Sequence, residues 1–218
     1  MAATQQVSPE ADQASAPRLH PRLRTRSIVL VGLMGAGKTT VGRALATTLH
    51  MPFRDADHEI ERAARRSVSE IFADRGEAEF RDGERRVIAR LLTREQPHVL
   101  ASGGGAFVQP ETRAVIQANA LAVWLKVDLE VLVRRVSRKN TRPLLHNRDP
   151  HEVLKTLAEQ RYPAYEQAEL TVDCGDVSTA MTVDVVLAAL NAHYHAQDRA
   201  QDEAQKDAQG RVQDGVGA

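Results

Sequence analysis

The sequence predicts an α/β protein in which helices flank a five-stranded parallel sheet. Short apolar runs alternate with segments of helix-spaced apolar residues, and the residues with the strongest chemical character follow the first three apolar runs. Strands separated by helices form βαβ units, which build parallel sheets with right-handed crossovers. Ligands of such sheets bind at the carboxyl ends of the strands, so we expect one site there.

The expected elements lie within a folded domain at residues 27–195. Strands are predicted at 28–31, 52–55, 98–102, 121–127 and 170–174, where the short apolar runs occur. Helices are predicted at 38–50, 57–65, 69–74, 77–94, 111–117, 129–137, 151–161 and 179–193. Ser67 and Glu70 have the spacing of a capping box that opens the helix at 69–74.

The first expected strand leads into the sequence GLMGAGKT, which starts at Gly32 and ends at Thr39. A strand, G-x-x-x-x-G-K-T and a helix, in that order, are typical of a loop that binds nucleotide phosphates. Its backbone N–H groups and the helix N-terminus would hold the phosphates, Lys38 would reach the terminal ones and Thr39 would ligate Mg²⁺. The alternative, an ordinary glycine turn, is disfavoured by the flanking elements. We therefore expect ATP or another nucleoside triphosphate to bind here.

Two carboxylates, Asp55 and Asp57, follow the second expected strand. One would lie near the metal and the other near an acceptor hydroxyl. The alternative is that either aspartate only caps the next helix.

Three glycines, Gly103, Gly104 and Gly105, follow the third expected strand and would let the backbone approach a small substrate. The alternative is a flexible connector. Arg81 lies in a charged helical stretch, where an arginine is most often a solvated or ion-paired surface residue.

A basic segment that contains proline lies between two expected helices, at about residues 138–150. The cations in and beside it are Arg134, Arg135, Arg138, Lys139, Arg142 and Arg148. Such a segment suits a lid over the transferring phosphate, and the alternative is a basic surface patch for an anion or a partner.

Composition favours a one-domain enzyme without a nucleic-acid or membrane partner. The 218 residues include 29 basic and 29 acidic side chains, so no net charge attracts the protein to either partner. The single cysteine, Cys174, cannot form an internal disulfide, which agrees with a reducing cytoplasm. We expect a cytoplasmic protein that acts as a monomer.

Both ends are expected to lie outside the folded domain. Residues 1–26 lack apolar periodicity, which favours a disordered extension over a transit peptide. Residues 196–218 form a low-complexity tail that either continues the last helix or is disordered. Removing residues 1–24 and 197–218 is expected to change melting temperature and turnover little.

The combination of motifs resembles the shikimate kinase family. The matching segments, in order, are GLMGAGKTTVGRALA, FRDADHEIE, IFADRGEAEFRDGE, ASGGGA, TRPLL and EQRYPAYEQAEL. The resemblance implies a P-loop kinase fold like that of nucleoside monophosphate kinases, with a five-stranded parallel sheet and a mobile lid. It implies transfer of a phosphoryl group from ATP, with Mg²⁺, to the 3-hydroxyl of shikimate, on the pathway to chorismate and aromatic amino acids.

The resemblance also implies a role for each site residue. Its nucleotide-binding residues are Gly35, Ala36, Gly37, Lys38, Thr39, Thr40, Arg135 and Arg142, and its metal-binding residues are Thr39 and Asp55. Its substrate-binding residues are Asp57, Arg81, Gly103, Gly104, Gly105 and Arg161. Lys38, Asp57 and Arg142 would be catalytic. The family usually carries Ser or Thr where this chain has Ala56, which removes a hydroxyl near the metal.

Other functions share parts of this pattern. A kinase for gluconate or for a nucleotide would share the phosphate loop, and the three glycines with Asp57, Arg81 and Arg161 distinguish it. A shikimate-kinase-like sensing domain of a transcription regulator would need a DNA-binding domain, which the 26 residues before the folded domain cannot supply. A basic-patch binding protein conflicts with the zero net charge.

Overall fold

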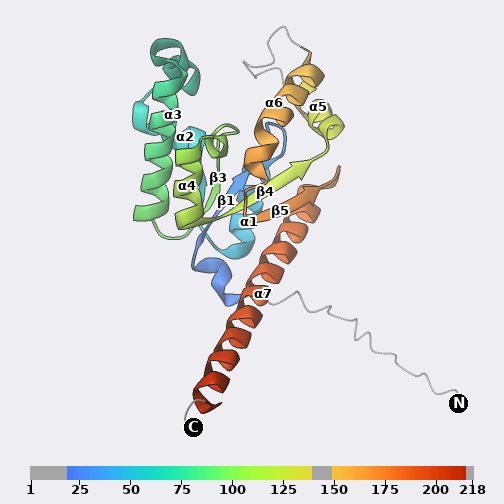
Figure 1. Ribbon diagram of the computed structural model, residues 1–218. Helices are drawn as coiled ribbons and strands as arrows, with labels where there is room; N and C mark the ends of the chain where they lie inside the picture. The colour runs from blue at the N-terminus through green and yellow to red at the C-terminus, as the bar shows by residue number, and fades with distance from the viewer. Residues whose placement is uncertain (1–18, 139–148, 215–218) are drawn as a thin grey trace, which may run out of the picture.

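A computed structural model describes residues 19–138 and 149–214 of the chain, with the backbone only for 207–214. Arg142 and nearly all of the expected lid lie outside the described residues. Figure 1 shows a sheet flanked by helices on both sides, with one long helix that projects away from the body.

The sheet has five parallel strands in the order β2-β3-β1-β4-β5. Their bounds are Ser27–Val31 for β1, Phe53–Asp55 for β2, Val99–Ala101 for β3, Ala120–Val127 for β4 and Leu170–Cys174 for β5. This architecture confirms the predicted fold class. Because β1 lies at the centre, the loop that follows it has a neighbouring strand end on each side.

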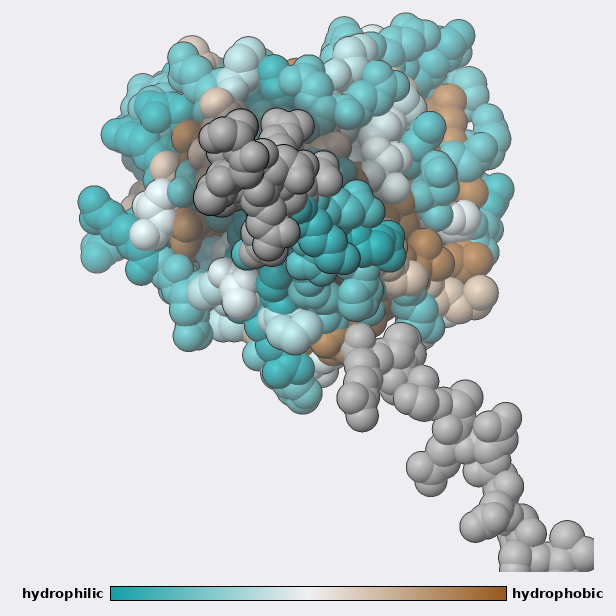
Figure 2. Space-filling model, turned by 60° about the horizontal axis from the view of Figure 1, so that its bottom comes forward, coloured by the Kyte–Doolittle hydropathy of each residue, from teal (hydrophilic) through white to brown (hydrophobic). Residues whose placement is uncertain are grey.

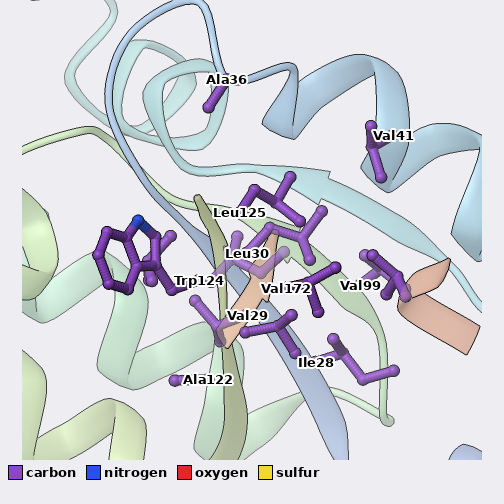
Figure 3. Packing of buried hydrophobic residues seen from close by; sticks show 14 of the residues in the cluster. Ile28, Val29, Leu30, Ala36, Val41, Val99, Ala122, Trp124, Leu125 and Val172 are labelled. Carbon is purple, nitrogen blue, oxygen red and sulfur yellow. The ribbon is translucent and has the colours of Figure 1, made fainter. Parts of the chain in front are cut away.

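The core forms where helices cover both faces of this sheet. All five residues of β1 are buried, as expected for a strand of a parallel sheet that is covered on both faces. Figure 3 shows Ile28, Val29 and Leu30 of β1 among side chains of other strands, including Trp124 of β4 and Val172 of β5. The core therefore anchors the strand ends that carry the site.

The α-helices are α1 (Lys38–Leu49), α2 (Ala56–Ala64), α3 (Val68–Arg94), α4 (Pro110–Asn119), α5 (Leu129–Ser137), α6 (Pro150–Tyr165) and α7 (Thr179–Asp214). Two short 3₁₀ helices, η1 and η2, span Pro21–Arg24 and Ala106–Val108. In Figure 1, α2, α3 and α4 gather at one side, and α5 and α6 lie at the other. Helix α1 packs against α7.

Helix α3 contains the break that the sequence predicts between residues 74 and 77. Gly76 has φ 77° and ψ 176°, so two helical segments meet there at a kink. The predicted capping box is confirmed, because the Ser67 side chain accepts from the Glu70 backbone N–H while the Glu70 side chain accepts from that of Ser67. The kink lies between the cap and the segment that carries Arg81.

Helix α6 runs four residues beyond its predicted end at Arg161, and Pro163 lies inside it. A proline this close to a helix end removes only one hydrogen bond of the last turn. The extra turn matters because it brings Tyr165, which is 1% exposed, to the Gly104 carbonyl in the loop after β3.

The predicted start of the folded domain at residue 27 is too late. Residues 21–24 form η1, and Leu23 is 1% exposed in the core. The His20 ring stacks on Tyr194 of α7, and the His20 backbone N–H donates to Asn191 Oδ1 at 2.8 Å. Residues 20–24 are too few to show a periodic pattern of apolar residues, so the sequence did not reveal their contact with α7.

Of the two alternatives for the C-terminal tail, the structure has the continued helix, since α7 extends to Asp214. The part beyond the body is polar and mostly exposed through residue 206, and Figure 2 shows its projecting end as hydrophilic. Among the described residues, no helix combines the length and apolar character needed to cross a membrane.

Candidate active site

A cleft of about 820 Å³ opens at the carboxyl ends of β1, β2 and β3. The predicted residues that line it are Gly35, Ala36, Gly37, Lys38, Thr39, Thr40, Asp55, Asp57, Arg81, Gly103, Gly104, Gly105, Arg135 and Arg161. Every site residue predicted from the sequence, except Arg142, therefore lies on one surface.

The loop between β1 and α1 has the backbone of a phosphate-binding loop. Gly35 and Gly37 have φ values of 85° and 92°, in the left-handed region that favours glycine. A Cβ on Gly35 would also lie 2.9 Å from Val136 Cγ1, so the loop packs tightly on α5. Helix α1 begins at Lys38, so its N-terminus faces the loop, and an anion there gains from the helix dipole.

The Lys38 side chain folds back across this loop. Its Nζ donates to the carbonyl oxygens of Gly32 at 2.8 Å and Leu33 at 3.0 Å. Its positive charge also lowers the pKa of Asp57, which lines the same cleft. A single cation at this position can serve both a nucleotide phosphate and an acceptor group.

Thr39 and Asp55 are in contact in the cleft, where Thr39 Oγ1 donates to Asp55 Oδ2 at 2.8 Å. Asp55 occupies the N-cap position of α2 but makes no capping hydrogen bond with its side chain, so the capping alternative does not account for it. Within residues 19–138 and 149–206, no group of three or more His, Cys, Asp or Glu side chains could hold a metal. A hydroxyl and one carboxylate nevertheless fit Mg²⁺, which keeps several waters and takes its other ligands from phosphates.

Asp57 lies in the first turn of α2, inside the helix and past its N-cap. Its carboxylate faces the cleft but has protein on its other sides, and this loss of hydration raises its pKa. The negative charges of Asp55 and Glu61 raise the pKa of Asp57 further, while Lys38 and Arg81 oppose them. A carboxylate whose proton affinity is increased in this way is a suitable acceptor for a hydroxyl proton.

Arg81 is held by two glutamates of its own helix. Its Nη1 donates to Glu84 Oε2 at 2.7 Å, and its Nη2 donates to Glu77 Oε1 at 3.1 Å. The Arg81 side chain is 18% exposed and that of Glu84 is fully buried, so this is not the solvated surface pair that an isolated arginine suggests. The guanidinium is therefore fixed in the wall of the cleft.

Glu84 was not predicted as a site residue, although it stands three residues after Arg81 on a helix, a spacing that places both on one face. Burial raises the pKa of Glu84, and the charges of Arg81 and Arg161 act against that rise. Glu84 Oε1 has no hydrogen-bond partner within the described residues. This buried acid therefore holds the Arg81 guanidinium and places a negative charge near Arg161.

The three glycines are needed because charged side chains pack directly on them. A Cβ on Gly103 would lie 2.5 Å from Glu84 Oε1 and 3.2 Å from Asp57 Oδ1. A Cβ on Gly104 would lie 3.0 Å from Arg161 Nη1, and one on Gly105 would overlap the guanidinium of Arg81. The loop is thus a bare backbone surface against which the charged residues are packed, not a flexible connector.

The other end of the cleft is formed by α5 and the start of α7. Arg135 Nη2 donates to the Gly175 carbonyl at 3.5 Å, and Arg134 pairs with Asp176 at 2.6 Å. Val177, 37% exposed, lines the cleft beside them. The sequence pattern gave no indication that the segment after β5 belongs to the site, because it carries no motif.

The fold and the cleft define a P-loop kinase that acts on a small molecule. A family model described as shikimate kinase matches residues 34–191. The chain is 62% identical over 168 residues to the shikimate kinase of Caulobacter vibrioides (strain NA1000 / CB15N), with coverage of 77% of this chain and 84% of that one. It is 51% identical over 188 residues to the shikimate kinase of Bradyrhizobium diazoefficiens, with coverage of 86% and 87%. The chain belongs to the shikimate kinase family, as the sequence motifs predicted.

Solved structures agree with this assignment. Shikimate kinase from Acinetobacter baumannii in complex with shikimate matches with a TM-score of 0.70 and 38% identity, over 76% of this chain and 93% of that chain. A gluconokinase from Sinorhizobium meliloti 1021 matches with a TM-score of 0.58 and 24% identity, over 80% of this chain and 98% of that chain. At that identity the second likeness shows a common fold only.

Proposed function

We propose that this protein transfers the γ-phosphoryl group of ATP to the 3-hydroxyl of shikimate, giving shikimate 3-phosphate and ADP. The observation that carries the proposal is that a phosphate-binding loop, Asp57, Arg81 and Arg161 share one cleft. Family membership and the shikimate-bound relative support the same substrate.

ATP would lie along the cleft with its phosphates on the loop at residues 35–40. The left-handed glycines and the start of α1 provide donors and partial positive charge there. Arg135 and Val177 would face the adenine, since they line the end of the cleft formed by α5 and the start of α7. Lys38 would leave the carbonyls that it contacts and move onto the transferring phosphoryl group, whose developing charge a positioned cation stabilises.

Thr39 and Asp55 would hold Mg²⁺, which supplies charge neutralisation of the β- and γ-phosphates. Ala56, between the two aspartates, is fully buried. The hydroxyl that the family usually carries at this position is therefore absent here. The Thr39 and Asp55 oxygens remain available to the metal in the cleft.

Shikimate would bind at the end of the cleft that carries the glycines. Arg81 and Arg161 would grip its carboxylate, because paired guanidinium groups bind planar carboxylates with charge-assisted hydrogen bonds. Asp57 would orient the attacking hydroxyl and accept its proton, consistent with its raised pKa. Arg142 would come onto the phosphates from the expected lid.

One assay tests the substrate: ADP release by the purified protein with ATP and Mg²⁺, measured separately with shikimate, quinate, gluconate, AMP and CMP. Turnover with shikimate at least tenfold above every other acceptor supports the proposal, since each factor of ten corresponds to 1.4 kcal/mol of discrimination. Turnover of gluconate or of a nucleotide in preference to shikimate would contradict it.

We further propose that the protein acts as a cytoplasmic monomer. The single cysteine, Cys174, cannot form an internal disulfide, and its thiol is buried, where burial raises its pKa to about 11 and keeps it unreactive. Sedimentation at assay concentration tests the monomer, and an active dimer with an inactive monomer would exclude it.

A further inference from the structure

We propose that Tyr165 is a positioning residue for the carboxylate end of the substrate site, acting through Gly104 and Arg161. The inference rests on the proposed function, since shikimate is the ligand whose binding it affects. Tyr165 itself is 1% exposed and is not among the residues that line the cleft, so it acts from behind the surface.

The Tyr165 hydroxyl connects two parts of the site. It donates a hydrogen bond to the Gly104 carbonyl, in the middle of the three glycines. The positive charge of Arg161, whose Nη1 packs on the same glycine, opposes the rise that burial causes in the pKa of Tyr165. The hydroxyl therefore fixes the Gly104 peptide group, against which the Arg161 guanidinium packs.

Sequence spacing explains this arrangement. Arg161 and Tyr165 are four residues apart on α6, so their side chains lie on one face of the helix. A Cβ on Gly104 would lie 3.0 Å from Arg161 Nη1 and 4.0 Å from the Tyr165 hydroxyl oxygen. The glycine, the arginine and the tyrosine thus form one packed unit, which requires the turn of α6 beyond Pro163.

Aromatic packing holds the Tyr165 ring in place. The centroid of its ring is 5.8 Å from that of Trp124 in β4 and 6.4 Å from that of Tyr162. Trp124 is 2% exposed, so the ring rests on the core. Burial raises the pKa of Tyr165 to about 12, so the phenol keeps its proton and donates to Gly104 throughout the working pH range.

The test is Tyr165→Phe, which keeps the ring and its packing but removes the hydroxyl. The KM for shikimate should rise roughly three- to tenfold, the effect of losing one hydrogen bond. The kcat and the KM for ATP should stay within about twofold, since the tyrosine reaches neither the phosphate loop nor Asp57. The pH profile of kcat/KM should keep its shape, because a group with a pKa of about 12 does not titrate in the assay range.

Tyr162→Phe is the matched control. Its ring also packs on Trp124, at 5.0 Å between centroids, but its hydroxyl is not part of the Gly104 contact. A double-mutant cycle with Arg161→Ala adds the second criterion. If Tyr165 acts through Arg161, removing its hydroxyl from the Arg161→Ala variant should raise the shikimate KM by less than half the factor seen in the wild type.

Three results would overturn the inference. They are an unchanged shikimate KM in folded Tyr165→Phe, equal losses for shikimate and ATP, and full additivity with Arg161→Ala. Because the wild-type protein is measured with shikimate in the same series, failure of the proposed function would appear there first, as absence of shikimate turnover.

Discussion

At the scale of single residues, the charge of the substrate end is balanced among several side chains. Glu84 pairs with Arg81 and also lies in the fields of Arg161 and Asp57. Burial raises the pKa of both acids, and the neighbouring cations limit that rise. The arginines remain able to attract an anionic substrate, and Asp57 remains able to accept a proton.

The raised pKa of Asp57 predicts that activity is lost on the acid side at a higher pH than an ordinary aspartate would cause. The sign follows from protonation, because a raised pKa means that the proton binds sooner as the pH falls, and protonated Asp57 cannot accept the hydroxyl proton. Glu61 is one of the charges that raise this pKa. Glu61→Gln should therefore move the acid limb of kcat/KM to lower pH.

The Val68 backbone N–H donates to Glu61 Oε1 at 3.0 Å, and in Glu61→Gln the side-chain amide oxygen can still accept this hydrogen bond. The fold should therefore persist. Glu159→Gln, an exposed acid on α6, is the control and should leave the profile in place. An acid limb that moves to higher pH in Glu61→Gln, or is unmoved, would contradict the assignment of that limb to Asp57.

Lys38→Ala should abolish most turnover while the protein remains folded. One positioned charge on a transferring phosphoryl group is worth about 3–4 kcal/mol, or on the order of 100–1,000-fold in kcat. Lys38→Arg should not restore activity, because a planar guanidinium does not replace a compact ammonium beside the Gly32 and Leu33 carbonyls. Near-normal kcat in either folded variant would exclude the proposed role.

Arg81→Ala and Arg161→Ala should each raise the shikimate KM at least about tenfold, since each removes charge-assisted hydrogen bonds worth roughly 1.5–3 kcal/mol. The affinity for ATP, measured by titration without shikimate, should be unchanged. Asp57→Asn should differ from both by lowering mainly kcat. Weaker ATP binding with normal shikimate binding in Arg81→Ala would show that the two ends of the cleft were assigned in reverse.

At the scale of elements, the loop after β3 and helix α3 depend on each other, because side chains of α3 pack directly on the glycines of the loop. Gly105→Ala should displace the Arg81 guanidinium, which a Cβ would overlap, and should raise the shikimate KM as Arg81→Ala does. Gly83→Ala on α3 is the matched control, since a Cβ there meets nothing within 4 Å. It should leave KM unchanged and stabilise the helix by up to about 1 kcal/mol.

Much of this arrangement was predictable from local pattern. Strands β1, β3 and β4 are buried apolar runs, the Gly76 break and the Ser67 cap carry their own signals, and the phosphate loop has a specific motif. Glu84 and Tyr165 were not found, because their packing on Gly103 and Gly104 appears only once distant segments come together. The end of α6 was misjudged because a proline usually stops a helix, whereas here tertiary packing retains one more turn.

At the scale of the whole molecule, the two ends of the chain meet on α7. His20 Nε2 lies 2.8 Å from Asp198 Oδ2, and Arg22 Nη1 donates to Asp198 Oδ1 at 3.0 Å. Arg22 also lies over the Tyr194 ring, 5.1 Å from its centroid. Asp198 and Arg22 are half-exposed, so their ion pair contributes little, and the buried Leu23 is the main attachment of this segment.

This contact changes the expectation for truncation. Removing residues 1–24 deletes Leu23, and the loss of a buried leucine side chain costs about 2–5 kcal/mol. The truncated protein should therefore melt at a lower temperature, and Leu23→Ala in the full chain should reproduce most of that loss. A chain starting at residue 19 is the matched control and should melt like the full chain. Removing residues 197–218 should cost little, since it takes the partly exposed pairs with Asp198 and the Gln197–His193 hydrogen bond. In every case kcat at 20 °C should be unchanged, because the contact is remote from the cleft. Equal melting temperatures for the chains starting at residues 19 and 25 would show that η1 does not stabilise the domain.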